Sequence, residues 1–118
     1  MRMMHQSGIA FGAHTVTHPI LSKLCISRAR EEIYTSKRVI EEELRAPVRT
    51  FAYPCGREED FNELTKSIVR DAGYMCAVTA IFGSNDSGQD VFKLRRGIPW
   101  EEDLPSFAIK LAWYKFHL

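Results

Sequence analysis

Apolar residues recur along the chain at two spacings, and these predict alternating strands and helices. Segments with apolar residues three or four positions apart, the spacing of one helical face, lie at 28–45, 61–72 and 105–116. Short apolar runs typical of buried strands lie at 9–13, 50–53, 74–80 and 91–98. A further helical end is expected at 1–7. Strands that alternate with helices predict an α/β fold with mostly parallel strands and helices on the outside.

Residues at the segment boundaries predict where two of the helices begin. Ser27 is expected to cap the long helix, because serine side chains accept hydrogen bonds from the first helical N–H groups. Asp60, with Glu63 three positions later, has the spacing of a capping box before the next helix. Charged residues of the long helix fall largely outside its apolar stripe, and Glu32 is expected among them on the polar face.

The length and composition restrict the function classes. A chain of 118 residues allows one small domain and excludes a complete closed (β/α)8 barrel, which needs about 250 residues. The 16 Lys and Arg residues against 15 Asp and Glu residues give a net charge of +1, so we expect neither nucleic acid nor an anionic membrane as partner. No apolar run is long enough for a membrane span. Three cysteines without a Cys-x-x-Cys pair are expected to be buried free thiols, with a single disulfide as the alternative: Cys25, Cys55 and Cys76.

Two histidines four positions apart, His14 and His18, stand where the first predicted strand ends. Imidazoles at this spacing can point the same way and share a divalent metal, and ligands of parallel α/β sheets bind at the carboxyl ends of strands. A structural or surface role for the pair is the alternative. A catalytic zinc site also needs a third ligand. The acids to consider, which fit ordinary caps and turns equally well, are Asp60, Asp86 and Asp90.

The second predicted strand ends in a turn that contains Pro54, Cys55 and Gly56. A proline and a glycine so close together force a sharp turn, which can aim a backbone N–H group into a site. The alternative is a strand end followed by an ordinary loop, and the local sequence favours neither.

Four segments, in this order, resemble motifs of one family, the polysaccharide deacetylases (the NodB-homology domain of carbohydrate esterase family 4). Residues 8–22 resemble its metal-binding motif, in which His-Ser/Thr-x-x-His follows a strand and precedes proline and a leucine-serine turn. Residues 51–56 resemble its Phe-Ala-Tyr-Pro-Tyr-Gly motif, with cysteine in place of the second tyrosine. Residues 72–79 resemble its Ala-Gly-Phe/Tyr strand, and residues 94–96 resemble its late leucine-x-arginine strand.

The resemblance implies a fold and an activity for residues 8 to about 116. The family fold is an irregular (β/α) barrel of the glycoside hydrolase/deacetylase type, and this chain is expected to form the C-terminal portion of it. The family hydrolyses carbon–nitrogen bonds other than peptide bonds and removes acetyl groups from N-acetylhexosamine units, with a divalent metal, usually zinc. An N-acetylated polysaccharide or oligosaccharide is therefore the expected partner. Family analogy also suggests an extracytoplasmic or cell-envelope location.

The resemblance also assigns roles to single residues. His14 and His18 are the expected metal ligands. The backbone N–H of Cys55 is the expected oxyanion donor. Arg96 is expected to orient a catalytic base. Substrate contacts are expected from Tyr53 and Pro54.

One family motif has no match in this sequence. The Thr-Phe-Asp-Asp-Gly strand carries the third metal ligand and the catalytic base, and the sequence contains no Asp-Asp pair. We therefore expect residues 1–118 to be a partial deacetylase domain that lacks the N-terminal Asp-Asp strand and is inactive alone. The alternative is a non-catalytic, degenerate deacetylase-like module that binds carbohydrate or another protein. Open strand edges are expected to favour self-association.

Overall fold

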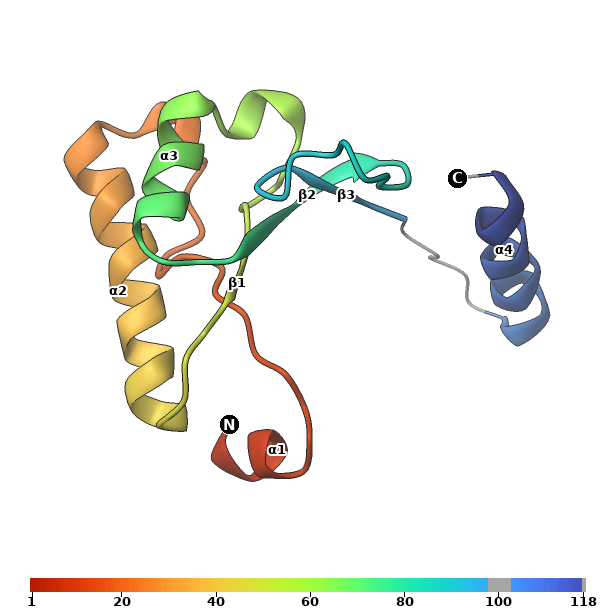
Figure 1. The fold of residues 1–118 in the computed structure, drawn as a ribbon, viewed down its shortest axis with the longest axis horizontal. Helices are drawn as coiled ribbons and strands as arrows, with labels where there is room; N and C mark the ends of the chain where they lie inside the picture. The colour runs from red at the N-terminus through yellow and green to blue at the C-terminus, as the bar shows by residue number, and fades with distance from the viewer. Residues whose placement is uncertain (98–102, 118) are drawn as a thin grey trace.

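The computed structural model describes residues 1–97 and 103–117, and strands and helices alternate along them (Figure 1). The elements in chain order are α1 (Arg2–Gln6), α2 (Ile26–Leu44), β1 (Thr50–Ala52), α3 (Glu63–Asp71), β2 (Cys76–Phe82), β3 (Leu94–Arg96) and α4 (Leu104–His117). Single 3₁₀ turns lie at Leu21–Lys23 and Glu58–Asp60. Helices α2 and α3 pack together beside the strands, and α4 lies apart from them, beyond the ends of β2 and β3. The predicted α/β fold is confirmed.

The three strands form one parallel sheet in the order β1-β2-β3. Thr50 pairs with Cys76, and Val78 pairs with Leu94. Because all three strands run the same way, the loops that follow them leave from one edge of the sheet. Strand β2 starts two residues later than the apolar run that predicted it, and β3 is shorter than its run, of which residue 98 lies outside the described part.

The strand expected at 9–13 is wrong except at its last residue. Ala13 forms an isolated parallel bridge with Phe51, in which Ala13 N donates to Thr50 O at 2.9 Å and Ala52 N donates to Ala13 O at 2.9 Å. Ile9 is exposed, and among the described residues no strand pairs with the outer side of this segment. Without a second neighbour, an apolar run is not held as a buried strand.

One apolar core joins the sheet to α2 and α3. The Tyr53 ring stacks on Phe61 with 4.4 Å between ring centroids, and it meets Phe51 edge-to-face at 5.5 Å. Burial of each large apolar side chain stabilises the fold by about 1.5–3 kcal/mol. The buried apolar residues of this core are Ala13, Leu21, Ala29, Ile33, Val48, Phe51, Tyr53, Phe61, Ile68, Val69, Tyr74 and Ala77.

The long helix starts two residues earlier than its sequence predicted. Cys25, not Ser27, is the N-cap residue, since its backbone is extended and its carbonyl accepts the Ala29 N–H at 3.0 Å. No side chain caps this end of the helix. The expectation that Ser27 caps α2 is therefore wrong, because the serine lies within the first helical turn.

The capping box of α3 is also shifted by two residues. Asn62 is the N-cap: its Oδ1 accepts the Thr65 N–H at 2.9 Å, and Thr65 Oγ1 accepts the Asn62 N–H at 2.9 Å. Asp60 instead closes the preceding 3₁₀ turn by accepting the Arg57 N–H at 3.0 Å. The predicted Asp60 cap is wrong because two candidate caps stand two residues apart, and the extended backbone between them starts the helix after the second.

The expected helix after Pro105 is present as α4. Its Tyr114 ring contacts Phe82 at the end of β2, with 5.4 Å between ring centroids. Among the described residues, no helix has both the length and the apolar character that a membrane crossing requires.

Candidate functional site

The two histidine rings lie together directly after Ala13. Their centroids are 4.7 Å apart, and the rings meet edge-to-face at 69°. His14 Nδ1 lies 2.7 Å from the carbonyl oxygen of Ala52, at the end of β1. A carbonyl oxygen only accepts, so Nδ1 carries the proton and Nε2 of the neutral ring keeps its lone pair. Nε2 is therefore the atom through which His14 can bind a metal.

The loop between the histidines is a strained turn. Thr15 and His18 have φ values of +67° and +59°, in the left-handed region that side chains with a Cβ rarely adopt. The Thr15 hydroxyl donates to His14 O at 2.5 Å and accepts the His18 N–H at 3.1 Å. These bonds tie the backbone of one histidine to that of the other.

Glu32 of α2 reaches this same loop, and the sequence did not predict it. Its Oε2 accepts the N–H groups of Val16 at 2.8 Å and Thr17 at 2.9 Å, and its Oε1 accepts the Thr17 hydroxyl at 2.6 Å. Only 2% of the residue is exposed, so its expected place on the polar face is wrong. Its spacing from the buried stripe could have indicated this, since it lies three residues after Ala29 and four before Ser36, which are both buried.

The turn after β1 exposes Cys55 at the same edge of the sheet, and Cys25 before α2 is an exposed free thiol too, so the expected burial of the cysteines is wrong for both. Gly56 N donates to Pro54 O at 2.7 Å, and Cys55 between them has a φ of +59°. Gly56 O in turn accepts the Ala80 N–H of β2 at 2.8 Å. Among the described residues, the Cys55 N–H has no hydrogen-bond acceptor, so it is available to an outside group.

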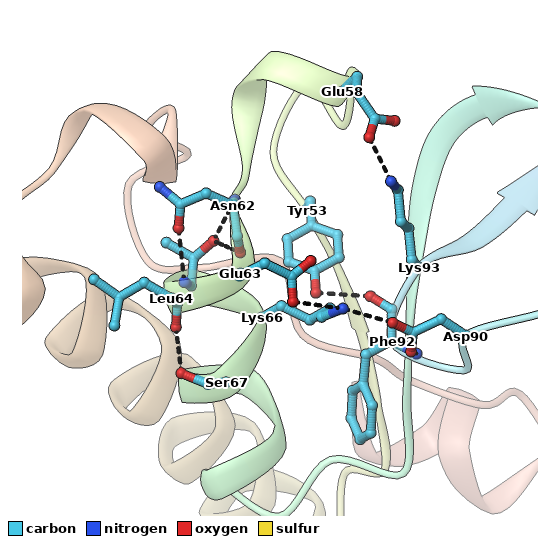
Figure 2. A network of polar contacts seen from close by, with 11 residues as sticks. Tyr53, Glu58, Asn62, Glu63, Leu64, Lys66, Ser67, Asp90, Phe92 and Lys93 are labelled. Atoms are coloured by element: carbon cyan, nitrogen blue, oxygen red, sulfur yellow. Dashed lines mark hydrogen bonds and ion pairs between the residues drawn. The ribbon is translucent and has the colours of Figure 1, made fainter.

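Tyr53 and Pro54 are buried, in contrast to Cys55. The Tyr53 hydroxyl donates to Phe92 O at 2.8 Å (Figure 2). Burial, reinforced by the negative charge of Asp90, raises the pKa of the Tyr53 phenol well above its usual value. Both side chains are fully buried among the described residues, and their expected contact with substrate stays a prediction.

Arg96, at the end of β3, is fixed against the neighbouring strand. Its Nε donates to Thr79 O of β2 at 2.6 Å. The bond leaves the rest of an exposed guanidinium beside the carboxyl ends of the strands, where the His14 and Cys55 segments also begin. Parallel topology thus brings these three predicted site residues to one edge of the sheet.

The three acids considered as a third metal ligand form hydrogen bonds or ion pairs with other residues. Asp60 is paired with Arg57 at 2.9 Å, and Asp90 with Lys66 at 2.6 Å. Asp86 accepts the N–H of Gly88 at 2.9 Å within its own loop. Across 1–97 and 103–117, no group of three His, Cys, Asp or Glu side chains is placed to hold a metal ion. Within the described residues, the His14 and His18 rings therefore lie together without an acidic or thiol side chain beside them.

Comparisons with known proteins relate this arrangement to one family. The family model for polysaccharide deacetylases matches residues 1–77. The Bacillus subtilis (strain 168) protein YxkH, whose name places it among polysaccharide deacetylases, is 29% identical over 96 residues. The matched region is 81% of this chain and 33% of YxkH, so the chain spans about a third of that relative.

Solved structures show the same relationship in three dimensions. The Streptococcus pyogenes deacetylase PplD, solved in complex with acetate, superposes with a TM-score of 0.76 at 30% identity, over 81% of this chain and 41% of PplD. The Bacillus cereus polysaccharide deacetylase BC0361 gives a TM-score of 0.70 at 27% identity, over 80% of this chain and 29% of BC0361. The parallel strands and helices described above therefore form part of a deacetylase (β/α) barrel.

Proposed function

Because this chain belongs to the polysaccharide deacetylase family, we propose that it carries one side of a metal-dependent deacetylase site. The substrate would be an N-acetylhexosamine unit of a polysaccharide, and the bond broken would be its acetamide carbon–nitrogen bond. The observation that carries the proposal is the His14–His18 pair, which lies at the same sheet edge as the exposed Cys55 turn. This edge is where parallel α/β folds bind their ligands.

The chemistry of the two imidazoles fits a divalent metal, and zinc best. His14 Nδ1–H is already bonded to Ala52 O, which fixes the ring and directs the basic Nε2 outward in the way that metal-binding histidines are usually held. His14 and His18 would hold the metal. When bound there, a zinc ion supplies a Lewis acid that polarises an amide carbonyl and lowers the pKa of water.

Cys55 would contact the substrate directly, whereas Arg96 would act on it through a catalytic base. The free N–H of Cys55 donates a hydrogen bond to the oxygen that gains negative charge as the acetamide carbonyl is attacked. The Gly56–Ala80 hydrogen bond fixes the direction of that N–H. Arg96, tied to Thr79 O, would use its remaining N–H groups to orient a carboxylate base at this edge of the sheet.

We further propose that the 118 residues do not hydrolyse substrate by themselves. Deacetylation needs a general base and a third metal ligand, and the described residues bring no carboxylate to the histidines. The same observation favours a second candidate, a non-catalytic module that binds carbohydrate or another protein through this edge. The two candidates differ in whether His14 and His18 bind metal.

Zinc titration followed by the imidazole resonances in NMR spectra tests the proposal. We expect zinc to shift the ring signals of His14 and His18, and His14→Ala and His18→Ala to abolish the response. His5→Ala, a histidine of α1 outside the site, is the matched control and should leave it intact. Zinc that moves neither ring would contradict the metal site, and N-acetylglucosamine oligomers that still shift Cys55-turn signals would then support the binding module.

Acetate release supplies the second readout. The isolated chain, given zinc or cobalt and N-acetylglucosamine oligomers, should release no acetate above the blank. Turnover that disappears in His14→Ala would show that this chain holds a complete site, and it would overturn the statement that further acids are needed.

A further inference from the structure

We propose that Glu32 is a positioning residue, whose buried carboxylate holds the His14–His18 loop in the conformation that binds metal. The inference rests on the proposed function, because it concerns the same metal site. Glu32 touches neither histidine in any hydrogen bond among the described residues. It acts through Val16 and Thr17, which lie between the two histidines and donate hydrogen bonds to its carboxylate.

The loop gives this one carboxylate three hydrogen bonds. Oε2 accepts two backbone N–H groups, from Val16 at 2.8 Å and from Thr17 at 2.9 Å, and Oε1 accepts the Thr17 hydroxyl at 2.6 Å. Consecutive N–H groups that converge on one oxygen form an anion-binding turn, and a carboxylate bonded in this way is held more firmly than a neutral acceptor. Arg28 adds a charged contact to Oε1 at 3.2 Å.

The loop requires such a bond partner because its backbone is strained on both sides. Thr15 at φ +67° and His18 at φ +59° both lie in the left-handed region, which is unfavourable for residues with a Cβ atom. Strain of this kind persists only where the surroundings over-determine the conformation. Glu32 provides that restraint from a helix, which is a rigid support for the segment between the two histidines.

The ionisation state of Glu32 agrees with this role. Burial alone would raise the pKa of its carboxyl, but the hydrogen bonds from the Thr17 hydroxyl and from the Thr17 and Val16 N–H groups outweigh it and lower the pKa. Glu32 is therefore a charged acceptor at neutral pH although only 2% of the residue is exposed. An uncharged side chain of the same size would accept fewer of these bonds.

A pair of variants on adjacent residues isolates the effect of Glu32. Glu32→Gln removes the charge and leaves the side-chain size, whereas Glu31→Gln is the matched control: Glu31 also pairs with Arg28, at 2.8 Å, but it is exposed and does not reach the loop. Circular dichroism and thermal melting first establish that both variants keep the fold.

Two measurements on the metal-free and zinc-titrated 118-residue chain follow. In the metal-free chain, we expect wild type and Glu31→Gln to show a nuclear Overhauser contact between the His14 and His18 rings, and slow exchange of the Val16 and Thr17 amides. Glu32→Gln should lose the ring contact and exchange these amides faster. With zinc, Glu32→Gln should bind at least about tenfold more weakly, as is typical when a partner of a metal-ligand segment is removed.

The outcomes separate this inference from the proposed function. If zinc binds neither wild type nor variants but the ring contact depends on Glu32, the metal site fails and the positioning role stands. If Glu32→Gln keeps both the ring contact and the zinc affinity of Glu31→Gln, the positioning role is overturned. Should Glu32→Gln unfold, Thr17→Val, which deletes only the hydroxyl donor to Oε1, gives the same test: an unchanged loop and zinc affinity in that variant would overturn the inference.

Discussion

The Nδ1 atom of His14 lies 2.7 Å from the carbonyl oxygen of Ala52, the last residue of β1. Ala52 is also joined to the residue before His14, since its N–H donates to Ala13 O at 2.9 Å. One residue of the sheet therefore fixes both the backbone that precedes the histidine and the ring itself. The imidazole is therefore held in one orientation and as the Nδ1–H tautomer without a bound ligand.

The tautomer of His14 is the first testable consequence. A free histidine in water prefers the proton on Nε2, but the bond to Ala52 O requires it on Nδ1 in the neutral ring. Long-range ¹H–¹⁵N NMR spectra above pH 8 should show His14 as the Nδ1–H form. His5, in α1, serves as the reference for a histidine outside this sheet edge. A His14 signal with the Nε2–H pattern would contradict the orientation described here.

Gly56 should be the glycine of the site turn that cannot be replaced. A Cβ atom at this position would lie 2.7 Å from Ala80 N, and the residue has a φ of +75°. Gly56→Ala should therefore lower the free energy of unfolding by about 2–4 kcal/mol, from strain plus a displaced strand. Gly8→Ala is the matched control, because Gly8 has a φ of +94° but open space around it. Its cost should be about 1 kcal/mol, from the backbone conformation alone.

Urea unfolding of both variants measures this difference. The Cys55 N–H resonance should move in Gly56→Ala and stay in place in Gly8→Ala, because only Gly56 is bonded to Ala80 beside it. Equal losses of stability in the two variants would show that the close approach to Ala80 carries no cost.

The sequence predicted the elements that follow from the spacing of apolar residues, and it missed the features that depend on contacts between distant segments. Apolar spacing was sufficient for α2, α3 and the parallel strands, because these elements bury a regular stripe or run. The segment 9–13 looked like a buried strand, yet its state depends on whether a second strand lies beside it, which no local pattern encodes. Glu32 looked like a solvent-facing charge because its partners, Val16 and Thr17, are backbone donors 16 and 15 residues away.

The candidate site was likewise predictable where it rests on local sequence motifs, and not where it rests on distant contacts. The spacing of His14 and His18 and the Pro-x-Gly turn at 54–56 were visible in the sequence, and parallel topology brings them to one edge. The burial of Tyr53 was not visible, because an aromatic residue at a strand end fits a pocket wall and a core equally well. Its hydroxyl finds Phe92 O, 39 residues further along, and only the folded chain shows that pairing.

Tyr53→Phe tests whether that hydroxyl is structural. The phenylalanine keeps the ring stacked on Phe61, and the change removes only the hydrogen bond to Phe92 O. The free energy of unfolding should fall by about 1–2 kcal/mol, because a partly buried carbonyl loses its partner. Tyr34→Phe, on the exposed side of α2, is the control and should change it by less than about 0.5 kcal/mol. A loss of zinc binding in Tyr53→Phe without a loss of stability would contradict the structural role.

The ammonium group of Lys66 links α3 to the loop before β3, and this link should control stability as a function of pH (Figure 2). Lys66 Nζ lies 2.6 Å from Asp90 Oδ2 and 2.9 Å from Glu63 Oε2, with 11% of the Lys66 side chain exposed. The bond from Lys66 lowers the pKa of the Asp90 carboxyl, and the bond to Asp90 raises the pKa of Lys66. Asp90→Asn should lower the free energy of unfolding by about 1–2 kcal/mol at pH 7, a figure reduced for the partial exposure of Asp90.

The signs of the two shifts define a pH window for this effect. A carboxyl whose folded pKa is lowered adds stability above its unfolded value of 3.8, and that stability disappears as the pH falls through the folded pKa. An ammonium whose folded pKa is raised adds stability below its unfolded value of 10.5, which is lost as the pH rises through the folded pKa. Urea unfolding should therefore separate wild type from Asp90→Asn between about pH 5 and 10, and the two curves should converge toward pH 3. Asp71→Asn, an exposed acid at the end of α3, is the control and should follow wild type throughout. A wild-type advantage over Asp90→Asn that persists undiminished at pH 3 would contradict the ion pair as its source.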